Sequence, residues 1–536
     1  MGLISMAQNE FFIATNYRGA FAPAPEAMWT DGWCNWDPQN AAYANPTVNV
    51  SANITSNTTW TANNVYLLQG QIYVQNNAVL TIEPGTIIRG DINTDGSGLF
   101  ITQGAKINAV GTASQPIVFT SSQPVGSRLL GDWGGLILLG RASINSVGGL
   151  ANIEGIAPTS DTQYGGGTTP DDNDNSGTLQ YVRIEFGGFI YQQNKEINGL
   201  TLGGVGRGTT IDHIQVSYAN DDAYEWFGGT VNCKNLVAYR CLDDDFDTDF
   251  GYSGNVQFAL SVRDPEISDD PTVSTSEGFE SDNDAAGDAA TPYTSAIFSN
   301  VTIVGPLRGD VSSSATIASG YRRAVRIRRN SHLNIFNSLF MDHVKGVMID
   351  GTACEANATA GTIGFKHNIL AGNTSNNVCE VSSTSTFDIH TWFGVNNNDS
   401  LVSTTGILTT PYDFLTPDYR PATSSVVLTG ASFTEPLFEG LMLSASTEIE
   451  TFDNAILFPN PTNSNLTIRF VAKSLRNLII SVSDISGRLV LQNSNYKSEI
   501  GENNLNVNVS NLNSGLYFIS LNDGKSNQSF KISVEK

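Results

Sequence analysis

An internal repeat of 22 to 23 residues limits the folds that this chain can adopt. IQVSYANDDAYEWFGG (214–229) aligns with LVAYRCLDDDFDTDFGY (236–252), and acidic, aromatic and glycine positions recur in the same order. The aligned pairs are Asp222 with Asp244, Tyr224 with Phe246, Glu225 with Asp247, and Gly228 with Gly251. A repeat of this length is typical of one coil of a solenoid, in which stacked coils bury a continuous core.

Short apolar stretches that end in glycine or Asn-Gly surround this repeat, for example AVLTIEPGTIIRG and GGLILLGRASIN. Apolar residues alternate or run in threes, which indicates strands rather than helices. Asn, Thr, Ser and Gly are abundant and only 15% of the residues are charged. The pattern predicts an all-β chain whose body is a right-handed parallel β-helix; a β-propeller or tandem sandwiches are the alternative.

Charge divides the chain into a body and a C-terminal module. Residues 455–536 hold eight Lys/Arg against five Asp/Glu, so the acidity of the chain, formally −24, belongs to the body. Such a charge disfavours nucleic acid as a partner and favours cations or neutral glycans. The predicted parts are a residual signal peptide (1–7), an N-terminal cap (8–60), the β-helix (61–379), an irregular capping tail (380–442), a linker (443–454) and the module (455–536).

Cysteines and hydropathy limit the chain further. Disulfides Cys233/Cys241 and Cys354/Cys379 with Cys34 left over are one interpretation, and five buried thiols are the other. There is no run of 18 apolar residues, so no transmembrane segment is predicted. Ser5-Met6-Ala7 has the small-x-small pattern of a signal-peptidase site, which is why the start is interpreted as the end of a signal peptide.

The acidic run DDDFDTDFG is the first candidate site. Asp243, Asp245, Asp247 and Asp249 alternate, so on a strand they would share one face, and Asp222 and Glu225 lie one coil earlier. Four like charges repel unless they are solvated or neutralised, and Ca²⁺ accepts six to eight oxygen ligands in flexible geometry. The run therefore predicts a calcium site; a water-exposed acidic ladder without an ordered ion is the alternative.

A second acidic turn, DINTDG (91–96), places Asp91, Asn93 and Asp95 at calcium-loop spacing. The glutamate that would complete an EF-hand loop is replaced by Thr102. A turn tip rich in turn-forming residues explains the segment equally well.

Arginine and aromatic residues suggest ligand contacts. Arg326 and Arg328 in YRRAVRIRRN share a strand face, and such guanidinium groups suit the carboxylates of acidic sugars; pairing with acids of neighbouring coils is the alternative. Trp226 is a candidate for stacking on a sugar ring. Trp29, Trp33 and Trp36 form either a similar surface or the apolar cap of the N-terminal end. Neither a Ser/His/Asp nucleophile motif nor histidines at metal-ligand spacing occur, so the catalytic residues are unknown.

The C-terminal module contains ILFPNPT, LIISVSDISGRLV and LNVNVSNLNSGLYFISL, alternating strands that predict a small antiparallel sandwich. It closely resembles the type A C-terminal sorting domain of the type IX secretion system of Bacteroidota. The resemblance implies recognition by that machinery at the outer membrane, and display on the cell surface or release. The matching residues are Pro459, Asn460, Pro461, Asp484, Gly487, Gly515, Tyr517 and Lys536.

The body resembles uncharacterised parallel β-helix passengers of the same pathway, through GDWGGLILLGRASIN and DNDNSGTLQYVRIEFGG. This resemblance supports the fold and leaves the function open. We expect a secreted or surface-displayed, ligand-binding or adhesin-like protein with a calcium-stabilised acidic face. A calcium-dependent polysaccharide lyase or hydrolase and a structural envelope spacer are the alternatives. A cleft lined by both the acids and the Arg322–Arg329 strand would favour the enzyme.

Overall fold

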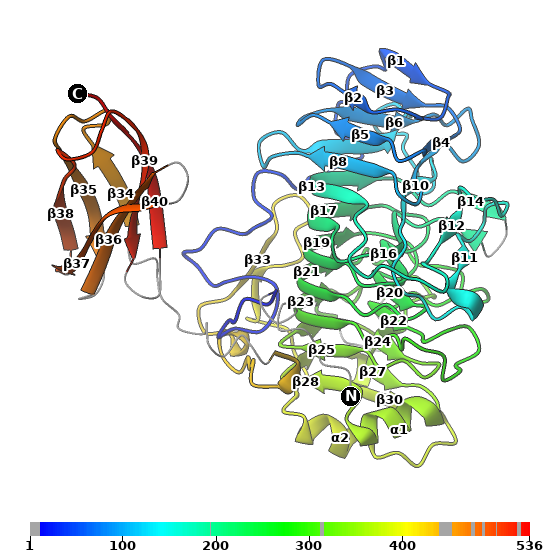
Figure 1. Ribbon diagram of the computed structural model, residues 1–536. Coiled ribbons are helices and arrows are strands. Elements are labelled where there is room, and N and C mark those ends of the chain that lie inside the picture. The colour runs from blue at the N-terminus through cyan, green and yellow to red at the C-terminus, as the bar shows by residue number, and fades with distance from the viewer. Residues whose placement is uncertain are drawn as a thin grey trace. The chain divides into compact units, whose positions relative to one another are not determined.

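The structure is a computed structural model that describes residues 11–192, 195–310, 316–438, 453–472, 477–484, 488–499, 501–522 and 527–536. The chain forms two compact units, Met1–Met442 and Leu443–Lys536 (Figure 1). The predicted signal peptide and residues 443–452 of the predicted linker lie outside the described residues.

The body is a parallel β-helix, as the repeat predicts. One side of its coils is a ten-stranded parallel sheet. Its strands are β4 (Gln71–Val74), β7 (Gly98–Ile101), β10 (Gly135–Leu139), β16 (Leu200–Val205), β18 (Tyr224–Gly229), β20 (Phe246–Asp249), β22 (Phe279–Ser281), β24 (Arg323–Ile327), β27 (Lys345–Ile349) and β30 (Cys379–Val381). The register pairs Tyr224 with Phe246 and Glu225 with Asp247, which confirms the alignment of the two repeats.

A 17-stranded parallel sheet forms the rest of the coils. Its strands are β1 (Val48–Val50), β2 (Thr58–Trp60), β3 (Val65–Leu68), β5 (Val79–Ile82), β6 (Ile87–Gly90), β8 (Lys106–Val110), β9 (Ile117–Ser121), β13 (Gly177–Glu185), β17 (Thr210–Ser217), β19 (Asn232–Tyr239), β21 (Asn255–Val262), β23 (Ile297–Val304), β25 (Asn334–Phe336), β26 (Leu339–Met341), β28 (Gly364–Lys366), β29 (Ile369–Ala371) and β31 (Asp399–Leu401).

The long strands of this sheet bend at one residue each, and the bends stack from coil to coil. Tyr181, His213 and Asn235 have φ of 51°, 56° and 54°, a left-handed conformation that turns the strand into two arms. The pairing of β13 with β17 skips Tyr181 and His213, whose rings stack 4.4 Å apart. Each coil therefore has three sides around its core.

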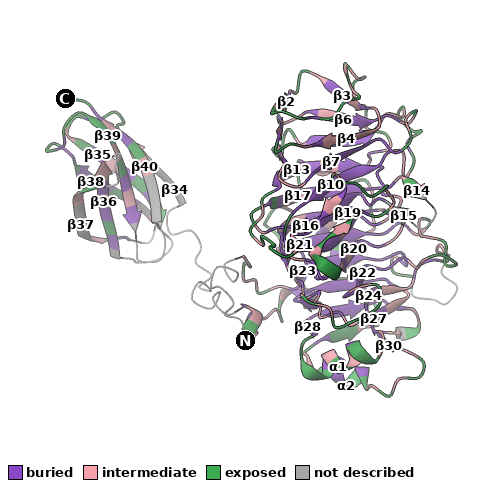
Figure 2. Ribbon diagram, turned by 45° about the vertical axis from the view of Figure 1, so that its right-hand side comes forward, coloured by how far each residue is buried: buried purple, intermediate pink, exposed green. Residues whose placement is uncertain are grey.

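Rows of aromatic side chains fill the interior in register with the strands. Phe246 stacks on Tyr224 of the previous coil and packs at a tilt against Phe279 of the next, at ring-centroid distances of 5.7 and 5.0 Å. The buried residues run through the whole solenoid (Figure 2). This packing is why inward positions of successive coils are apolar although the chain as a whole is polar.

The coils extend beyond both predicted limits. They begin at β1 and end at β31, so part of the predicted capping tail is itself a coil. The helix α2 covers the last coil with buried Ile389, Trp392 and Phe393. The other elements of the body are α1 (Thr352–Ala360), α2 (Ile389–Val395), the 3-10 helices Val147–Gly149, Thr374–Asn376, Val426–Leu428 and Pro436–Phe438, and the paired strands β11 (Ala151–Asn152) with β12 (Gln163–Tyr164), β14 (Ile190–Gln192) with β15 (Lys195–Glu196), and β32 (Leu408–Thr410) with β33 (Asp418–Pro421).

The N-terminal segment, residues 11–47, lies along the side of the solenoid rather than across its end. The Gly19 N–H donates to the Asn337 carbonyl and the Asn35 N–H to Gln215 Oε1, coils far from the first one. Trp33 packs edge-on against Tyr181 and His213. The expectation of an N-terminal cap over 8–60 therefore needs correction, because Trp29 and Trp33 pack against aromatic side chains at the strand bends in the middle of the solenoid.

Two further expectations concern cysteines and membranes. Cys34, Cys233, Cys241, Cys354 and Cys379 are all free, so neither predicted disulfide is formed and the interpretation as thiols holds. No helix in the described ranges is long and apolar enough to cross a membrane.

The C-terminal unit consists of two antiparallel sheets, which confirms the predicted sandwich. One sheet contains three strands and the other four. The C-terminal unit has a hydrophobic core of its own, in which Leu466 and Ile468 of one sheet pack with Val482 and Ile519 of the other. The strands are β34 (Asp453–Phe458), β35 (Asn465–Ala472) and β38 (Gly501–Asn508) in the first sheet, and β37 (Leu489–Lys497), β36 (Asn477–Asp484), β39 (Gly515–Asn522) and β40 (Asn527–Val534) in the second.

Candidate functional site

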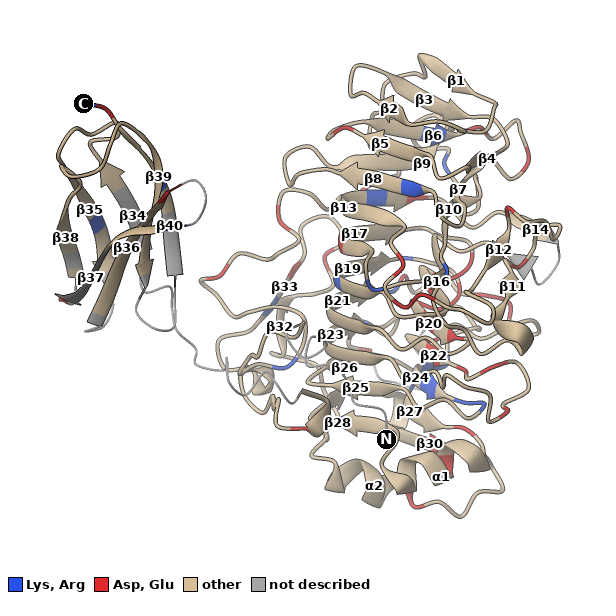
Figure 3. Ribbon diagram, viewed as in Figure 1, with Lys and Arg blue, Asp and Glu red and all other residues tan. Residues whose placement is uncertain are grey.

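The outer face of the ten-stranded sheet changes character from one end to the other. Its first coils have apolar residues at the outward position, its middle coils have acids there, and an arginine follows; Figure 3 colours these acidic and basic positions on the ribbon. Because the strands are in register, these residues form one continuous row. The row is Tyr73, Phe100, Ile137, Thr201, Glu225, Asp247, Glu280, Arg326, Met348 and Glu380.

The structure corrects the prediction that four alternating aspartates share one face. β20 begins only at Phe246, so Asp247 and Asp249 alternate on the strand while Asp243 lies in the turn before it. Asp245 is fully buried, where its Oδ1 accepts a 2.7 Å hydrogen bond from Arg263 Nη1. The alternation rule fails for Asp243 and Asp245 because it applies only within an extended strand.

Seven acids from successive coils instead form what we call the carboxylate cluster: Asp221, Asp222, Glu225, Asp243, Asp244, Asp247 and Glu280. They make three overlapping groups whose oxygen atoms lie within 4.8 Å of one another. The groups are Asp221–Asp222–Asp243, Asp222–Glu225–Asp247 and Asp244–Asp247–Glu280. A cavity of about 490 Å³ is lined by the cluster together with Glu154, Asp269, Arg328 and Arg329.

Hydrogen bonds hold part of this cluster in place. Asp222 Oδ1 accepts from the Asp244 N–H at 2.8 Å, and Asp244 Oδ1 accepts from the Glu277 N–H at 2.5 Å. Oδ1 of Asp243 and Oδ1 of Asp247 are buried and have no hydrogen-bond partner within the described residues. A buried oxygen without a partner is costly, so these two atoms indicate room for a ligand that the chain does not supply.

The electrostatics of the cluster oppose ionisation. Burial, reinforced by the neighbouring carboxylates, raises the pKa of Asp222, Glu225, Asp243, Asp244 and Asp247 well above the ordinary range. Burial also raises the pKa of Glu280 to about 7, although Arg328 opposes this. A divalent cation would reverse the effect, because it favours the ionised form of every carboxylate that contacts it.

The predicted ligand-binding arginines pair with acids of neighbouring coils. Arg326 Nη2 lies 2.8 Å from Asp350 Oδ2, and Arg328 Nε lies 2.7 Å from Asp282 Oδ1. Arg328 also contacts Glu280. Both guanidinium groups are therefore engaged, although Arg328 lines the same cavity as the acids.

Trp226 requires a correction. Its side chain is completely buried inside the solenoid, between Tyr224 and Tyr252 at ring-centroid distances of 5.9 and 5.3 Å. An inward position cannot stack on an external sugar. The next residue, Phe227, faces outward instead and lines a neighbouring pocket.

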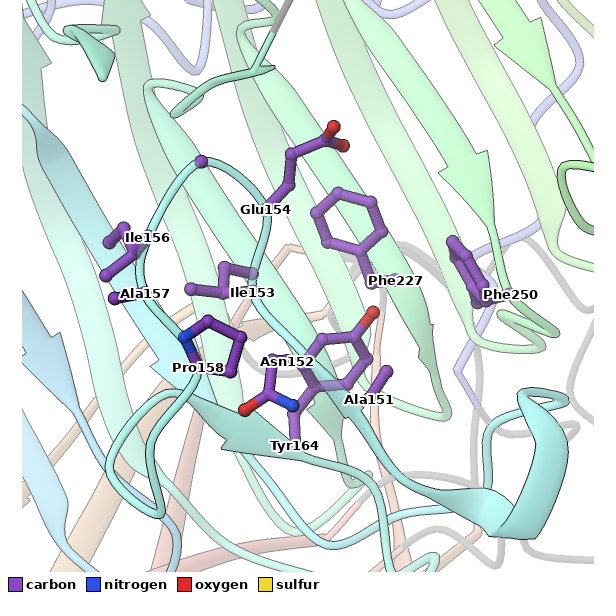
Figure 4. Close-up of a pocket in the computed structure, with 11 residues that line it drawn as sticks. Ala151, Asn152, Ile153, Glu154, Ile156, Ala157, Pro158, Tyr164, Phe227 and Phe250 are labelled. Atoms are coloured by element: carbon purple, nitrogen blue, oxygen red, sulfur yellow. The ribbon is translucent and has the colours of Figure 1, made fainter. Parts of the chain in front are cut away.

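This second pocket, of about 460 Å³, lies beside the carboxylate cluster and is mostly apolar. Phe227 and Phe250 line it together with Tyr164, and the segment 151–158 curves over it (Figure 4). Glu154 lines both this pocket and the acidic cavity. The outer face of the sheet therefore offers carboxylates and an aromatic surface side by side.

The turn at 91–96 is held by its own hydrogen bonds. Asp91 is buried, which would raise its pKa, but donors on Gln69, Asn93 and Thr94 outweigh burial and lower it. Asn93 and Asp95 are exposed. Calcium binding at this turn stays a prediction.

Sequence reasoning missed Glu280 and did not include Asp244 among the candidate metal ligands. Glu280 belongs to GFESD (278–282), where Phe279 pairs with Phe246 and Glu280 with Asp247. The signal was an aromatic residue followed by an acid. It was hidden because the coil between β20 and β22 is longer than 22 residues.

Most residues of the predicted sorting motif have structural roles in the C-terminal unit. The Asn460 side chain donates to the Lys531 carbonyl at 3.0 Å and accepts from the Ser533 N–H at 2.8 Å, which ties the segment of Pro459 and Pro461 to the last strand. Asp484 pairs with Arg488, Tyr517 follows Gly515 on β39, and Lys536 Nζ donates to the Ser510 carbonyl. Gly487 lies outside the described residues.

A coiled parallel β-sheet body with an acidic outer face, followed by a separate antiparallel sandwich, defines the class of a parallel β-helix protein with an additional C-terminal β-domain. Residues 52–407 match the family described as "Pectate-lyase like beta helix domain", and the chain belongs to this family. Residues 456–535 match the "Secretion system C-terminal sorting domain". The protein is therefore exported through the type IX secretion system, to the cell surface or the medium.

Other comparisons add no functional information. No curated protein matches the chain. Two solved structures are similar at a TM-score of 0.23. The Dettilon tailspike protein (gp208) is 8% identical, with 89% of this chain and 85% of that chain covered. Tailspike protein 2 of Escherichia coli O157:H7 bacteriophage CAB120 is 11% identical, with 88% and 64% covered. At this similarity neither structure carries an argument.

Proposed function

We propose that the protein is a secreted or surface-displayed binding protein whose acidic face holds Ca²⁺ and, through it, an extracellular glycan. The observation that supports this proposal best is the carboxylate cluster, in which Asp222 joins the first group of oxygens to the second and Asp247 joins the second to the third. One or more cations between adjacent coils would neutralise the cluster and satisfy the buried oxygens of Asp243 and Asp247.

The chemistry of the cluster favours calcium over other metals. Its three groups contain only carboxylate oxygens, whereas zinc and copper sites usually include His or Cys. Mg²⁺ demands near-ideal octahedral geometry and retains several waters, while Ca²⁺ accepts many ligands in irregular arrangements. Acids that come from several stacked coils suit the less demanding ion.

Calcium titration of the full chain by calorimetry, with thermal unfolding in calcium and in chelator, tests the metal site. We expect calcium to raise the melting temperature, since a ligand that binds only the folded state stabilises it. Asp247→Asn should weaken calcium affinity about 10- to 100-fold or more, the range known for residues that only support metal ligands. Asp249→Asn is the matched control, because Asp249 lies two residues away on the same strand but in none of the three groups. Equal affinities for the two variants, or no calcium binding, would contradict the proposal.

The glycan is inferred from the pairing of the cation cluster with the aromatic pocket. Sugar rings present hydroxyl and carboxylate oxygens that complete a calcium shell, and an apolar face that stacks on aromatic rings. A glycan array with and without calcium tests this part. We expect calcium-dependent signals that Phe227→Ser reduces. An absence of binding in both conditions would favour the structural spacer.

A calcium-dependent polysaccharide lyase is the second candidate. Arg328 and Arg329 line the same cavity as the carboxylate cluster, which is the arrangement that a lyase would need. Burial would lower the pKa of Arg328, but Glu280 and Asp282 outweigh it and raise the pKa, which opposes a role as proton acceptor. Absorbance of a conjugated double bond formed from acidic polysaccharides would establish the lyase instead of the binding protein.

A further inference from the structure

The first coil of the solenoid, residues 48–60, is bonded to a neighbouring coil on one side only. β1 pairs with β3, β2 pairs with β5, and Ile54 bridges to Val74; no other partner of these strands lies in the described ranges. Ile54 and Trp60 close the core beneath the coil. The remaining edge presents unpaired backbone groups, a template for pairing with another chain.

Among the residues that the structure describes, nothing gives this edge the usual protection against pairing. Proteins block such edges with charged side chains, proline or a covering element. Between Asp37 and Glu83 the sequence contains no Asp, Glu, Lys, Arg or His, and no proline falls within the first coil. The strands β1 and β2 are only three residues long, so one strand pair alone would be weak. A contact between two whole coils would pair both strands at the same time and would therefore be stronger than one strand pair.

Electrostatics restrict where two copies of this chain can meet. The chain carries a formal charge of −24, so most faces of two copies repel each other. The coils from β1 to β5 are free of charged residues, whereas acids and arginines concentrate further along the body (Figure 3). A second copy that presents the same uncharged coil meets the least repulsion there.

The opposite end of the solenoid is closed. The helix α2 follows β30 and packs Trp392 on Phe365 at a ring-centroid distance of 6.4 Å, and the last coil bears the exposed Asp399. A head-to-tail contact, which would continue into a filament, is therefore blocked. Among contacts between the ends of two solenoids, the head-to-head contact remains, and such a contact forms a closed dimer of two copies.

We propose that two copies of the protein associate through their first coils, head to head about a twofold axis, with antiparallel pairing of the edge strands. Antiparallel pairing follows from the axis, because a twofold rotation reverses the direction of the facing strands. Residues 48–60 are then an interface between copies, and each dimer presents two acidic faces.

Sedimentation velocity and light scattering on the full chain test this interface. We expect twice the monomer mass of 57.4 kDa. Asn49 and Thr59 are exposed on the two edge strands, so N49K/T59K and N49E/T59E should each give monomers with unchanged melting temperature, because like charges face each other. An equimolar mixture of the two variants should restore the dimer, because opposite charges then meet.

V395K/V402K is the matched control, since both valines are exposed, at 71% and 64%, near the closed end. This control should remain dimeric. A monomeric wild type at every concentration, or a dimer that survives both charge variants, would overturn the proposal. So would dissociation by the control, or a mixture of the two variants that stays monomeric.

Discussion

At the scale of single residues, the buried pair Asp245–Arg263 has the clearest energetic consequence. Both side chains are fully buried, and the Arg263 guanidinium also lies 5.0 Å from the Tyr321 ring. Arg263→Met leaves Asp245 without its cation, so we expect a loss of about 3–5 kcal/mol in the free energy of unfolding. Urea denaturation measures it, with Arg141→Met at an exposed arginine as the control. Equal losses in the two variants would refute the prediction, and Asp245→Asn in the Arg263→Met background should recover part of the stability.

Residue-level prediction succeeded where it used the repeat and failed where it used local alternation. Glu225 and Asp247 lie side by side in the cluster because the repeat predicts the register of neighbouring coils. Asp245 and Trp226 were misplaced because the sequence does not mark where the strand begins or which of its faces points inward. The fold followed from periodicity, which many residues share, whereas the site depends on individual side-chain directions.

At the scale of elements, the ten-stranded sheet should make stability depend on pH. Burial, with Asp282 and Asp284 nearby, raises the pKa of Asp249 to about 8, although the Phe250 N–H and Arg329 oppose this. Burial, with Asp282 and Glu277 nearby, also raises the pKa of Glu280 to about 7, against the opposing effect of Arg328 and Arg326. The folded state therefore retains protons that the unfolded chain releases. In chelator, the contribution of these carboxyls to the free energy of unfolding should be fully present below about pH 4 and should be lost as the pH rises to about 8.

Denaturant titrations across this pH range check the slope. Asp249→Asn removes one of the titrating groups and should flatten the slope, and calcium should flatten it in the wild type because it stabilises the ionised cluster. Stability that rises with pH in chelator would show that other groups dominate.

The N-terminal segment is the element whose position the sequence did not reveal. Its tryptophans were recognised as a cluster, but the partners Tyr181 and His213 lie far away in the chain. Trp33→Ala should cost about 3–5 kcal/mol because it empties a buried site against two coils. Ile13→Ala, at a side chain 55% exposed in the same segment, is the control for chemical denaturation. Similar losses for both would mean that the segment is not packed as described.

At the scale of the whole molecule, separate hydrophobic cores in the two units predict two unfolding transitions and a division of roles. Leu260 belongs to the core of the body and Leu478 to the core of the sandwich, and both are fully buried. Leu260→Ala and Leu478→Ala should each lower the free energy of unfolding by about 2–5 kcal/mol, but each in a different calorimetric transition. The sorting signal resides in the sandwich, so Leu478→Ala should reduce delivery to the surface or medium in cell fractionation while Leu260→Ala leaves delivery intact. A single transition that shifts in both variants, or equal export of both, would show that the units do not fold and act separately.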